Sequence, residues 1–198
     1  MKNTQSSKKN SLRIIGGELR SRKIGFPDIE ELRPTPDRIR ETLFNWLQDC
    51  IQESECLDLF AGSGALGIEA LSRGAQRAVF VECNRQVYAA LQENLQRFRL
   101  DKGEAINAEA AQWQKSCGDT AQQFDIVFLD PPFSDDNIYE VCARLDRCGC
   151  LKPKSKIYVE SGLQLECPGL PNNWTRLKHK QAGQVYYYLF EANTNPKK

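Results

Sequence analysis

Apolar residues along the chain predict an α/β fold, because short β-prone runs alternate with stretches of helical spacing. The runs that predict strands are 56–60, 78–82, 104–107, 124–129 and 156–160. Apolar residues recur every three or four positions in 65–73, 84–98, a short segment around Trp113, and 138–145. Asn84 is well placed to cap the second of these helices. Strands and helices that alternate at this length predict a doubly wound, mainly parallel sheet.

A hairpin is predicted before this alternation begins. Residues 12–15 and 19–24 have the composition of two short strands, and they flank a Gly-Gly pair at 16–17 that is typical of hairpin turns. In this interpretation Arg20 and Arg22 line one face of the second strand. The N-terminal part of the chain therefore forms a small antiparallel unit outside the main sheet.

An amphipathic helix is predicted directly after the hairpin. Thr35 is placed as its N-cap and Pro36 as its first helical residue. Its apolar residues recur at helical spacing: Ile39, Leu43, Phe44, Trp46 and Leu47. Arg38, Arg40 and Glu41 then fall mostly off the apolar face.

A second hairpin is predicted at the C-terminal end. Strands at 174–179 and 184–190 pair about an Ala-Gly turn at 182–183. The residues after Glu191 are polar and predict a disordered tail, as residues 1–10 do at the other end.

Composition is that of a globular protein in a reducing compartment. The chain has 198 residues, 40% hydrophobic and 27% charged, which fits one domain of ordinary size. No apolar run approaches the roughly 20 residues that span a bilayer, and the polar N-terminus does not resemble a secretory signal. We therefore expect a cytoplasmic protein without membrane contact. The eight cysteines include no Cys-x-x-Cys pair and His179 is the single histidine, so buried reduced thiols are favoured over a zinc site or disulfides.

Charge is unevenly distributed along the chain. The net charge is +1, yet residues 1–25 contain seven lysines and arginines against one acid. A basic arm on a mildly acidic body indicates a polyanionic partner, because lysine and arginine displace counterions from phosphates. The side chains expected to contact phosphates are Arg13, Arg20, Arg22 and Lys23, with Arg38 at the mouth of the binding pocket. For residues 1–10 a solvated tail is the favoured interpretation.

A glycine-rich loop follows the first predicted strand of the sheet. The segment from Asp58 to Gly67 reads Asp-Leu-Phe-Ala-Gly-Ser-Gly-Ala-Leu-Gly and matches G-x-G-x-x-G between a strand and a helix. Glu82 ends the next strand, where a carboxylate can bind both hydroxyls of a ribose. Nicotinamide dinucleotides and S-adenosylmethionine (SAM) are both candidates. Asp58 favours SAM, because its carboxylate would repel a pyrophosphate but attract the cationic amino-acid end of a sulfonium cofactor.

The strand at 124–129 runs directly into Asp130-Pro131-Pro132-Phe133. The prolines end the strand because neither can donate to a ladder, which fixes an acid at the carboxyl edge of the sheet. Such a corner suits a planar, amine-bearing ring: the Asp130 carboxylate and the Pro131 carbonyl accept its N–H bonds, and Phe133 stacks on it. The alternative is that Asp-Pro-Pro is turn punctuation only.

Several segments together resemble the bacterial 16S ribosomal RNA guanine-N2 methyltransferases of the RsmD family. These segments are Arg13-Ile-Ile-Gly-Gly, Arg33-Pro-Thr-Pro-Asp-Arg-Ile-Arg-Glu-Thr-Leu-Phe-Asn-Trp-Leu, Phe60-Ala-Gly-Ser-Gly-Ala-Leu-Gly-Ile-Glu-Ala-Leu-Ser-Arg-Gly, Asp130-Pro-Pro-Phe and Ala182-Gly-Gln-Val. The similarity covers the chain from Leu12 to about Phe190.

The resemblance implies a Rossmann-like, class I SAM-dependent methyltransferase. Its mostly parallel seven-stranded sheet would carry helices on both faces and a small N-terminal hairpin. Residues 11–50 would form the RNA side and 51–191 the methyltransferase domain, between tails at 1–10 and 192–198. The implied reaction transfers a methyl group from SAM to the exocyclic N2 amine of one guanine in 16S rRNA of the small ribosomal subunit. The protein would act as a monomer and without a metal.

The resemblance also implies the roles of individual residues. Cofactor contacts are expected at Asp58, Ala61, Gly62, Ser63, Gly64, Glu82, Cys83, Glu109, Ala110 and Asp130. The base would be held by Asp130, Pro131, Pro132 and Phe133. Family members often have Asp or Asn before the alanine where this chain has Glu109, so the adenine contact is the point of departure. Direct transfer needs no covalent intermediate and no catalytic cysteine.

Two further functions remain open from the residues alone. Methyltransferases acting on adenine N6 or on a protein glutamine amide also need an exocyclic-amine grip, although they usually carry Asn in place of Asp or a large recognition domain. A protein with this fold could also bind RNA as an inactive assembly factor. The complete glycine loop, Glu82 and the Asp-Pro-Pro-Phe corner favour an active enzyme over that alternative.

Overall fold

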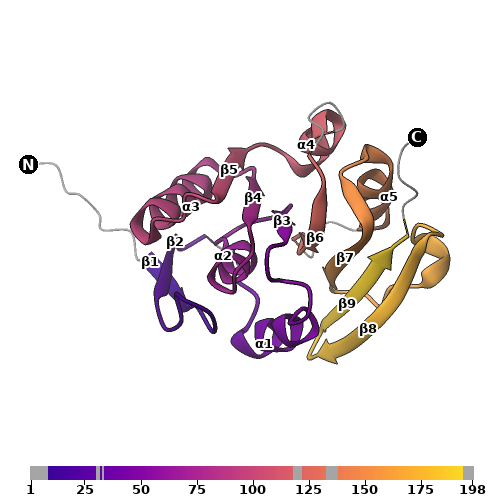
Figure 1. Ribbon diagram of the computed structural model, residues 1–198, viewed down its shortest axis with the longest axis horizontal. Helices are drawn as coiled ribbons and strands as arrows, with labels where there is room; N and C mark the ends of the chain where they lie inside the picture. The colour runs from indigo at the N-terminus through magenta and orange to yellow at the C-terminus, as the bar shows by residue number, and fades with distance from the viewer. Residues whose placement is uncertain (1–8, 30–31, 33, 118–121, 133–137, 194–198) are drawn as a thin grey trace, which may run out of the picture.

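A seven-stranded sheet runs through the molecule (Figure 1). The computed structural model describes residues 9–29, 32, 34–117, 122–132 and 138–193. The strand order is β5-β4-β3-β6-β7-β9-β8. The strands are β3 (Glu55–Asp58), β4 (Arg77–Glu82), β5 (Gly103–Asn107), β6 (Phe124–Leu129), β7 (Leu151–Ser161), β8 (Trp174–Ala182) and β9 (Val185–Ala192). Strands β3 to β7 are parallel and β9 is antiparallel to both of its neighbours.

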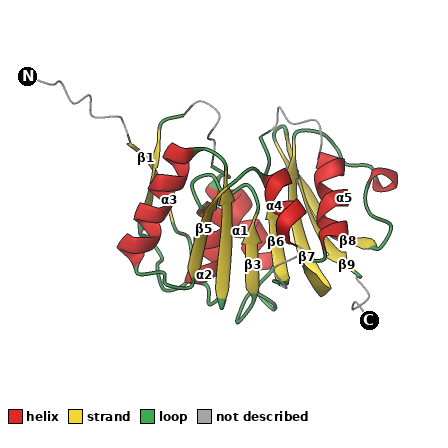
Figure 2. Ribbon diagram, turned by 90° about the horizontal axis from the view of Figure 1, so that it is seen from above, coloured by secondary structure: helices red, strands yellow, loops and turns green. Residues whose placement is uncertain are grey.

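Helices cover both faces of this sheet (Figure 2). Alternate side chains of a strand point to opposite faces, so Ile126 and Phe128 of β6 enter one apolar cluster while Val127 and Leu129 enter the other. The first cluster includes residues of α1 (Asp37–Trp46), α2 (Ala65–Ser72) and α3 (Arg85–Phe98), and the second includes residues of α4 (Ala110–Ser116) and α5 (Ile138–Cys148). The predicted doubly wound, mostly parallel fold is confirmed.

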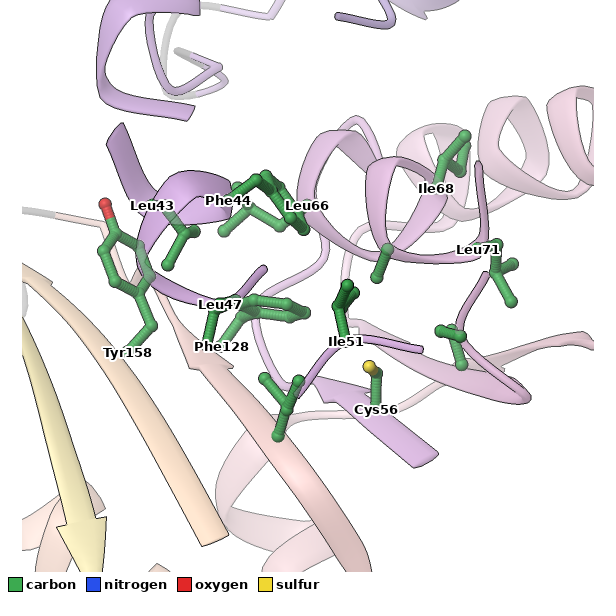
Figure 3. Close-up of a cluster of buried hydrophobic side chains, with 14 of the residues drawn as sticks. Leu43, Phe44, Leu47, Ile51, Cys56, Leu66, Ile68, Leu71, Phe128 and Tyr158 are labelled. Carbon is green, nitrogen blue, oxygen red and sulfur yellow. The ribbon is translucent and has the colours of Figure 1, made fainter. Parts of the chain in front are cut away.

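The first cluster shows how α1 is held against the sheet (Figure 3). Leu43 and Phe44 of α1 lie with Phe128 of β6 and Tyr158 of β7, and all four side chains are almost completely buried. The rings of Phe44 and Phe128 are 6.0 Å apart and tilted. This packing places the N-terminal end of α1 beside the carboxyl ends of β6 and β7.

Local sequence signals set the bounds of α3 as predicted. The Asn84 side chain accepts hydrogen bonds from the backbone N–H groups of Gln86 and Val87, so it caps the helix. The cap follows β4 directly, which fixes the end of that strand next to the start of α3.

The N-terminal hairpin is present, but its strands differ from those predicted. β1 (Lys9–Arg13) pairs antiparallel with β2 (Lys23–Pro27), and the turn between them contains residues 19–22. The placement of Arg20 and Arg22 on a strand was therefore wrong. β1 also begins at Lys9, inside the range expected to be a tail.

Contacts with the end of α2 explain why the turn is longer than predicted. Ser72 accepts hydrogen bonds from the amides of Glu18 and Leu19, and its hydroxyl donates to the Gly16 carbonyl. Gly17 has φ +74°, and a Cβ there would lie 1.7 Å from the Ser72 carbonyl oxygen. Residues 16–19 are thus bonded to α2 and are not free to extend the strands.

Arg40 and Thr35 also differ from their predicted positions. Arg40 is completely buried, because its guanidinium pairs with Asp37 at 2.6 Å and with Glu69 at 3.6 Å. A buried arginine is tolerated when such partners compensate its charge. Thr35 makes no capping bond: Pro36 occupies the N-cap of α1 without a side-chain cap, and the Thr35 hydroxyl bonds elsewhere.

Glu69 of α2 joins the hairpin to the sheet domain. Its buried carboxylate accepts the Ile15 amide at 2.8 Å and the Gly16 amide at 2.7 Å. The same carboxylate pairs with Arg40 and, at 2.7 Å, with Arg73. The hairpin, α1 and α2 therefore share one buried charged group.

The C-terminal hairpin is confirmed, with a tight turn between β8 and β9. β9 lies between β7 and β8, so the last described strand is an inner strand of the sheet. β7 begins five residues earlier than predicted, at Leu151. Among the described helices, none combines the length and apolarity needed to cross a bilayer.

Candidate active site

A cavity of about 1090 Å³ opens at the carboxyl-terminal edge of the parallel strands. Open α/β sheets bind their ligands at this edge, where the strand order reverses. Here the reversal falls between β3 and β6. Most of the cavity walls come from the carboxyl ends of the parallel strands: residues 58–63 at the end of β3, 81–84 at the end of β4, 108–110 after β5, 130–132 after β6, and 160 and 162 at the end of β7. The β8–β9 turn adds 181 and 183–186, and the segment 29–36 adds further residues.

The three glycines of the loop after β3 serve different purposes. Gly62 (φ +50°) lines the cavity, and Gly64 (φ +78°) is the N-cap of α2. A Cβ on Gly67 would lie 2.2 Å from the Phe80 ring, so this glycine allows α2 to pack closely on β4. Ser63 lines the cavity, whereas Gly64 does not. The expected cofactor contact of Gly64 therefore stays a prediction, and its place at the start of α2 helps to shape the loop.

Asp58 ends β3 with a buried carboxyl group at the cavity wall. It accepts a hydrogen bond from the Gly67 amide at 3.0 Å, in the first turn of α2. Burial raises the pKa of Asp58 to about 7, against the lowering effect of the Gly67 bond, and the charges of Asp130 and Glu82 raise it further. A buried carboxyl with one hydrogen-bond donor is thus available to a cationic ligand group.

Glu82 ties the end of β4 to the glycine loop. One of its carboxylate oxygens accepts the Gly62 amide at 2.8 Å, and the other accepts the Asn84 amide at 2.7 Å. The oxygen bonded to Asn84 also accepts the Cys83 thiol at 3.8 Å, while the oxygen bonded to Gly62 retains a lone pair for a further donor, and the residue lines the cavity. These bonds orient the carboxylate at a position suited to a ribose diol.

Asp130 follows β6 on the opposite side of the cavity from the β4 end. The Thr35 hydroxyl donates to its Oδ2 at 3.0 Å, across 95 positions of sequence. Burial raises the pKa of Asp130 to about 6, while the bond from Thr35 lowers it. Pro131 and Pro132 line the same cavity, Pro131 buried and Pro132 exposed. Phe133 lies outside the described residues.

Glu160 is a second carboxyl group beside Asp130, and the sequence reasoning missed it. It is 2% exposed, lines the cavity near the end of β7, and accepts a hydrogen bond from the Tyr158 hydroxyl at 2.7 Å. Burial and then the charge of Asp130 raise the pKa of Glu160 to about 8. The available signal was an acid at the end of the run 156–160, the same signal that identified Glu82.

The comparisons with known proteins agree with this geometry. A family model described as "Conserved hypothetical protein 95" matches residues 12–191. Ribosomal RNA small subunit methyltransferase D of Escherichia coli K12 is 43% identical over 191 residues, covering 96% of this chain and 95% of the relative. The protein of that name from Haemophilus influenzae is 44% identical over 186 residues, covering 92% and 95%.

The chain belongs to the family of ribosomal RNA small subunit methyltransferase D. The solved structure of yhhF from Escherichia coli superimposes with a TM-score of 0.84 at 42% identity, covering 94% of this chain and all of that one. The match confirms the resemblance seen in the sequence and the fold that it implies.

Four other residues expected at the cofactor of this family member line the cavity: Ala61, Cys83, Glu109 and Ala110. Burial and the charges of Glu82 and Glu109 raise the pKa of the Cys83 thiol, so it stays neutral. Glu109 is the N-cap of α4 but makes no capping bond, and its side chain is exposed. The cavity also includes apolar residues that were not predicted, among them Val81, Val87 and Ala108.

The basic residues expected to bind RNA lie on the surface and none of them lines the cavity. They are Arg13, Arg20, Arg22, Lys23 and Arg38. Arg13 is 3.7 Å from the Asp37 carboxylate, and the Arg22 guanidinium lies 5.7 Å from the centre of the Phe98 ring. The first four belong to the hairpin unit, whereas Arg38 is in the first turn of α1, close to the cavity residues Thr35 and Pro36.

Proposed function

We propose that the protein transfers a methyl group from SAM to the exocyclic N2 amine of a guanine in 16S rRNA of the small ribosomal subunit. One observation carries the proposal: the Asp130-Pro131-Pro132 corner lines the same cavity as the glycine loop, Asp58 and Glu82. The names of the closely similar relatives support small-subunit ribosomal RNA as the substrate.

The residues around the glycine loop fit SAM. Burial raises the pKa of the Asp58 carboxyl to about 7. The positive ammonium group of the methionine portion of SAM would favour the ionised form of this carboxyl and pair with it. Glu82 would accept the ribose hydroxyls, and Cys83, Glu109 and Ala110 would surround the adenine with the apolar residues nearby. SAM supplies an electrophilic methyl group on a sulfonium.

Asp130 and Pro131 would prepare the amine for attack. The guanine N2 lone pair is delocalised into the ring, so the nitrogen is a poor nucleophile. Accepting its two N–H bonds with the Asp130 carboxylate and the Pro131 carbonyl favours a pyramidal nitrogen with the lone pair directed at the methyl carbon. The new N–C bond forms as the C–S bond breaks, and Asp130 takes the proton that N2 loses.

Thr35 and Glu160 would set the charge of Asp130 during this step. The Thr35 hydroxyl stabilises the ionised form of Asp130, and Glu160, when protonated, adds no competing negative charge. Ionised Asp130 beside protonated Glu160 is an arrangement in which Asp130 can accept the N2 proton at neutral pH. Once the guanine has flipped out of its RNA structure into the cavity, Phe133 would stack on it.

RNA would reach this site along the basic hairpin. The hairpin unit exposes four basic side chains: Arg13, Arg20, Arg22 and Lys23. They would bind RNA phosphates and would not distinguish one base from another. Arg38 would contact the backbone near the flipped base. All groups in this mechanism come from one chain, so we propose that the protein acts as a monomer.

Transfer of labelled methyl groups tests the proposal. Small-subunit RNA from a strain that lacks this protein is incubated with the enzyme and labelled SAM, and the modified nucleotide is mapped. One N2-methylguanine per RNA is expected. Label on adenine N6 or on protein would reject the guanine assignment. SAM binding without any transfer would favour the inactive RNA-binding alternative.

The Asp130→Ala variant separates methyl transfer from SAM binding. It should lose turnover while SAM still raises its melting temperature, because Asp58 and Glu82 remain in place. Turnover at the wild-type rate in this variant would remove Asp130 from the mechanism.

A further inference from the structure

Three cysteines from three structural elements meet at the amino-terminal edge of the sheet, away from the cavity. Cys117 caps the end of α4, Cys148 is the last residue of α5, and Cys150 immediately precedes β7. Their sulfur atoms all lie within 4.8 Å of one another. Cys117 and Cys150 are buried and Cys148 is half-buried, so the cluster belongs to the interior of the protein.

The sulfur spacing suits a tetrahedral metal ion. Sulfurs bound to zinc at about 2.3 Å in tetrahedral geometry are roughly 3.8 Å apart. The separation between Cys148 Sγ and Cys150 Sγ is 3.0 Å, and the largest in the cluster is at most 4.8 Å. One separation is thus shorter than the zinc spacing, and none exceeds that spacing by more than about 1 Å.

The backbone around the three cysteines is well anchored. Gly149 has φ +81°, a conformation that turns the chain sharply between Cys148 and Cys150. The Cys150 carbonyl accepts the Phe124 amide at 2.8 Å, which fixes it to the start of β6. Gln114, one turn before Cys117, donates to the Val141 carbonyl of α5 at 3.1 Å. The cluster is therefore held in place by two helices and the sheet.

The charge around the cluster favours bound thiolates. A small cavity of about 170 Å³ adjoins Cys148 and is otherwise lined by Gln114, Lys115, Arg144 and Arg147. Three thiolates with one Zn²⁺ carry a net charge of −1, which these three cationic side chains offset. The two arginines are only loosely paired with Glu140, at 3.8 Å and 3.4 Å.

The same cavity offers a place for a fourth ligand. Gln114 Oε1 is buried and accepts no hydrogen bond from any part of the chain that the structure describes. Buried polar atoms in this state usually indicate a partner such as a water or an ion. An amide oxygen or a water held by it would complete four-coordination at an ion bound by the three sulfurs.

We propose that Cys117, Cys148 and Cys150 bind one Zn²⁺ ion, with the fourth position facing the small cavity beside Gln114. On binding, the thiols lose their protons to solvent and three S–Zn bonds form, with no change in oxidation state. The ion would join the ends of α4 and α5 to the start of β7. Sequence spacing disfavoured zinc because Cys148 and Cys150 are separated by one residue, and only the fold brings Cys117 to them.

Metal titration of the whole protein tests this site. Reduced, chelator-treated protein is titrated with Zn²⁺ against a chromophoric chelator, and with Co²⁺ to record the thiolate charge-transfer band. We expect one ion per chain, a Co²⁺ band typical of sulfur ligands, and a higher melting temperature with Zn²⁺ than with chelator. Absence of the band, or of tight one-to-one binding, would overturn the proposal.

Cysteine variants locate the ion. Cys148→Ala, at the half-buried position, should weaken binding by at least about tenfold, since even outer-shell changes cost 10–100-fold in metal affinity. Cys142→Ala, a buried thiol of α5 outside the cluster, should keep full stoichiometry. Equal affinity in wild type and Cys148→Ala would reject the site, as would a disulfide among the three cysteines in protein isolated under thiol-trapping conditions.

Discussion

The Thr35 hydroxyl donates to Asp130 Oδ2 over 3.0 Å, so the segment that leads into α1 is bonded to the acid at the end of β6. Burial raises the pKa of both Asp130 and Glu160, and the Thr35 hydroxyl lowers the pKa of each. A residue with the sequence features of a helix cap thus stabilises the ionised form of Asp130, the proposed proton acceptor.

Thr35→Val should move the acid limb of the pH–rate profile to higher pH. The substitution removes a bond that lowers the pKa of Asp130, so a higher pH is needed to ionise the carboxyl. Turnover is measured from pH 5 to 8 with SAM saturating. Thr42→Val, which removes an exposed hydroxyl bonded to the Arg38 carbonyl, is the control. An acid limb at the wild-type position would show that Thr35 does not set this ionisation.

Asp58→Asn should weaken SAM binding by about 2–5 kcal/mol, the usual loss when one partner of a buried charge pair is removed. Asparagine can still accept the Gly67 amide, so the fold should persist. Because the pKa of Asp58 is raised to about 7, wild-type affinity should increase from pH 6 to pH 8 as the carboxyl ionises. Calorimetry of both proteins over this range is the measurement. A pH dependence that survives in Asp58→Asn would assign it to another group.

Stability without cofactor should fall as the pH rises from about 4.5 to 8. The pKa of Glu160 is raised to about 8 in the folded protein, so the folded state binds more protons than the unfolded state across this window. The stabilisation is complete below the unfolded pKa and is lost as the pH passes the folded one. Denaturant unfolding at several pH values should show the decline. Glu160→Gln should reduce it, above all between pH 7 and 8, and the remainder comes from Asp58 and Asp130, whose pKa values burial also raises. A decline of the same size in the variant would exclude Glu160 as its source.

Glu69→Gln should destabilise the protein by about 3–5 kcal/mol, because the buried Arg40 and the neighbouring Arg73 would both lose a buried anionic partner. Urea unfolding measures the change, and an unaltered m-value would show that the unfolding reaction is the same. Glu41→Gln, an exposed glutamate on α1, should change stability by less than about 0.5 kcal/mol. Equal stability of the two variants would contradict the structural role given to Glu69.

Arg20→Gln and Arg22→Gln should each reduce the slope of log affinity against log salt by about 1, if each arginine neutralises one phosphate. RNA binding is measured between low and physiological salt with a small-subunit RNA fragment. Lys154→Gln is the control, since this exposed lysine lies in β7 near the amino-terminal edge of the sheet. An unchanged slope in both arginine variants would leave the hairpin without a role in RNA binding.

The fold was predictable because its signals are local. Residues 126–129 alternate between the two apolar clusters, and the Asn84 side chain caps α3 by accepting the amides of Gln86 and Val87. The sequence-based predictions were wrong where a residue distant in sequence overrides the local structural preference. Ser72 bonds to Gly16, Glu18 and Leu19 and lengthens the turn, so the hairpin strands lie farther from it than predicted, while Glu69 pairs with Arg40 in the interior.

The candidate site was predictable in its motifs but not in its connections. Asp58, Glu82 and Asp130 each follow a strand, so position along the chain was enough to identify them. Glu160 becomes significant only because β7 lies beside β6, and Thr35 only because α1 packs across both strands. The Cys117 cluster depends in the same way on three elements that meet in space.

The position of β9 has a consequence for incomplete chains. This strand is the last one described, yet it fills the space between β7 and β8 and pairs with residues 155–161 of β7. A chain that stopped before Val185 would expose the long edge of β7 and the apolar side chains beneath it. Such an edge pairs readily with other chains, so nonsense truncations near the C-terminus should yield aggregates in place of a slightly shorter enzyme.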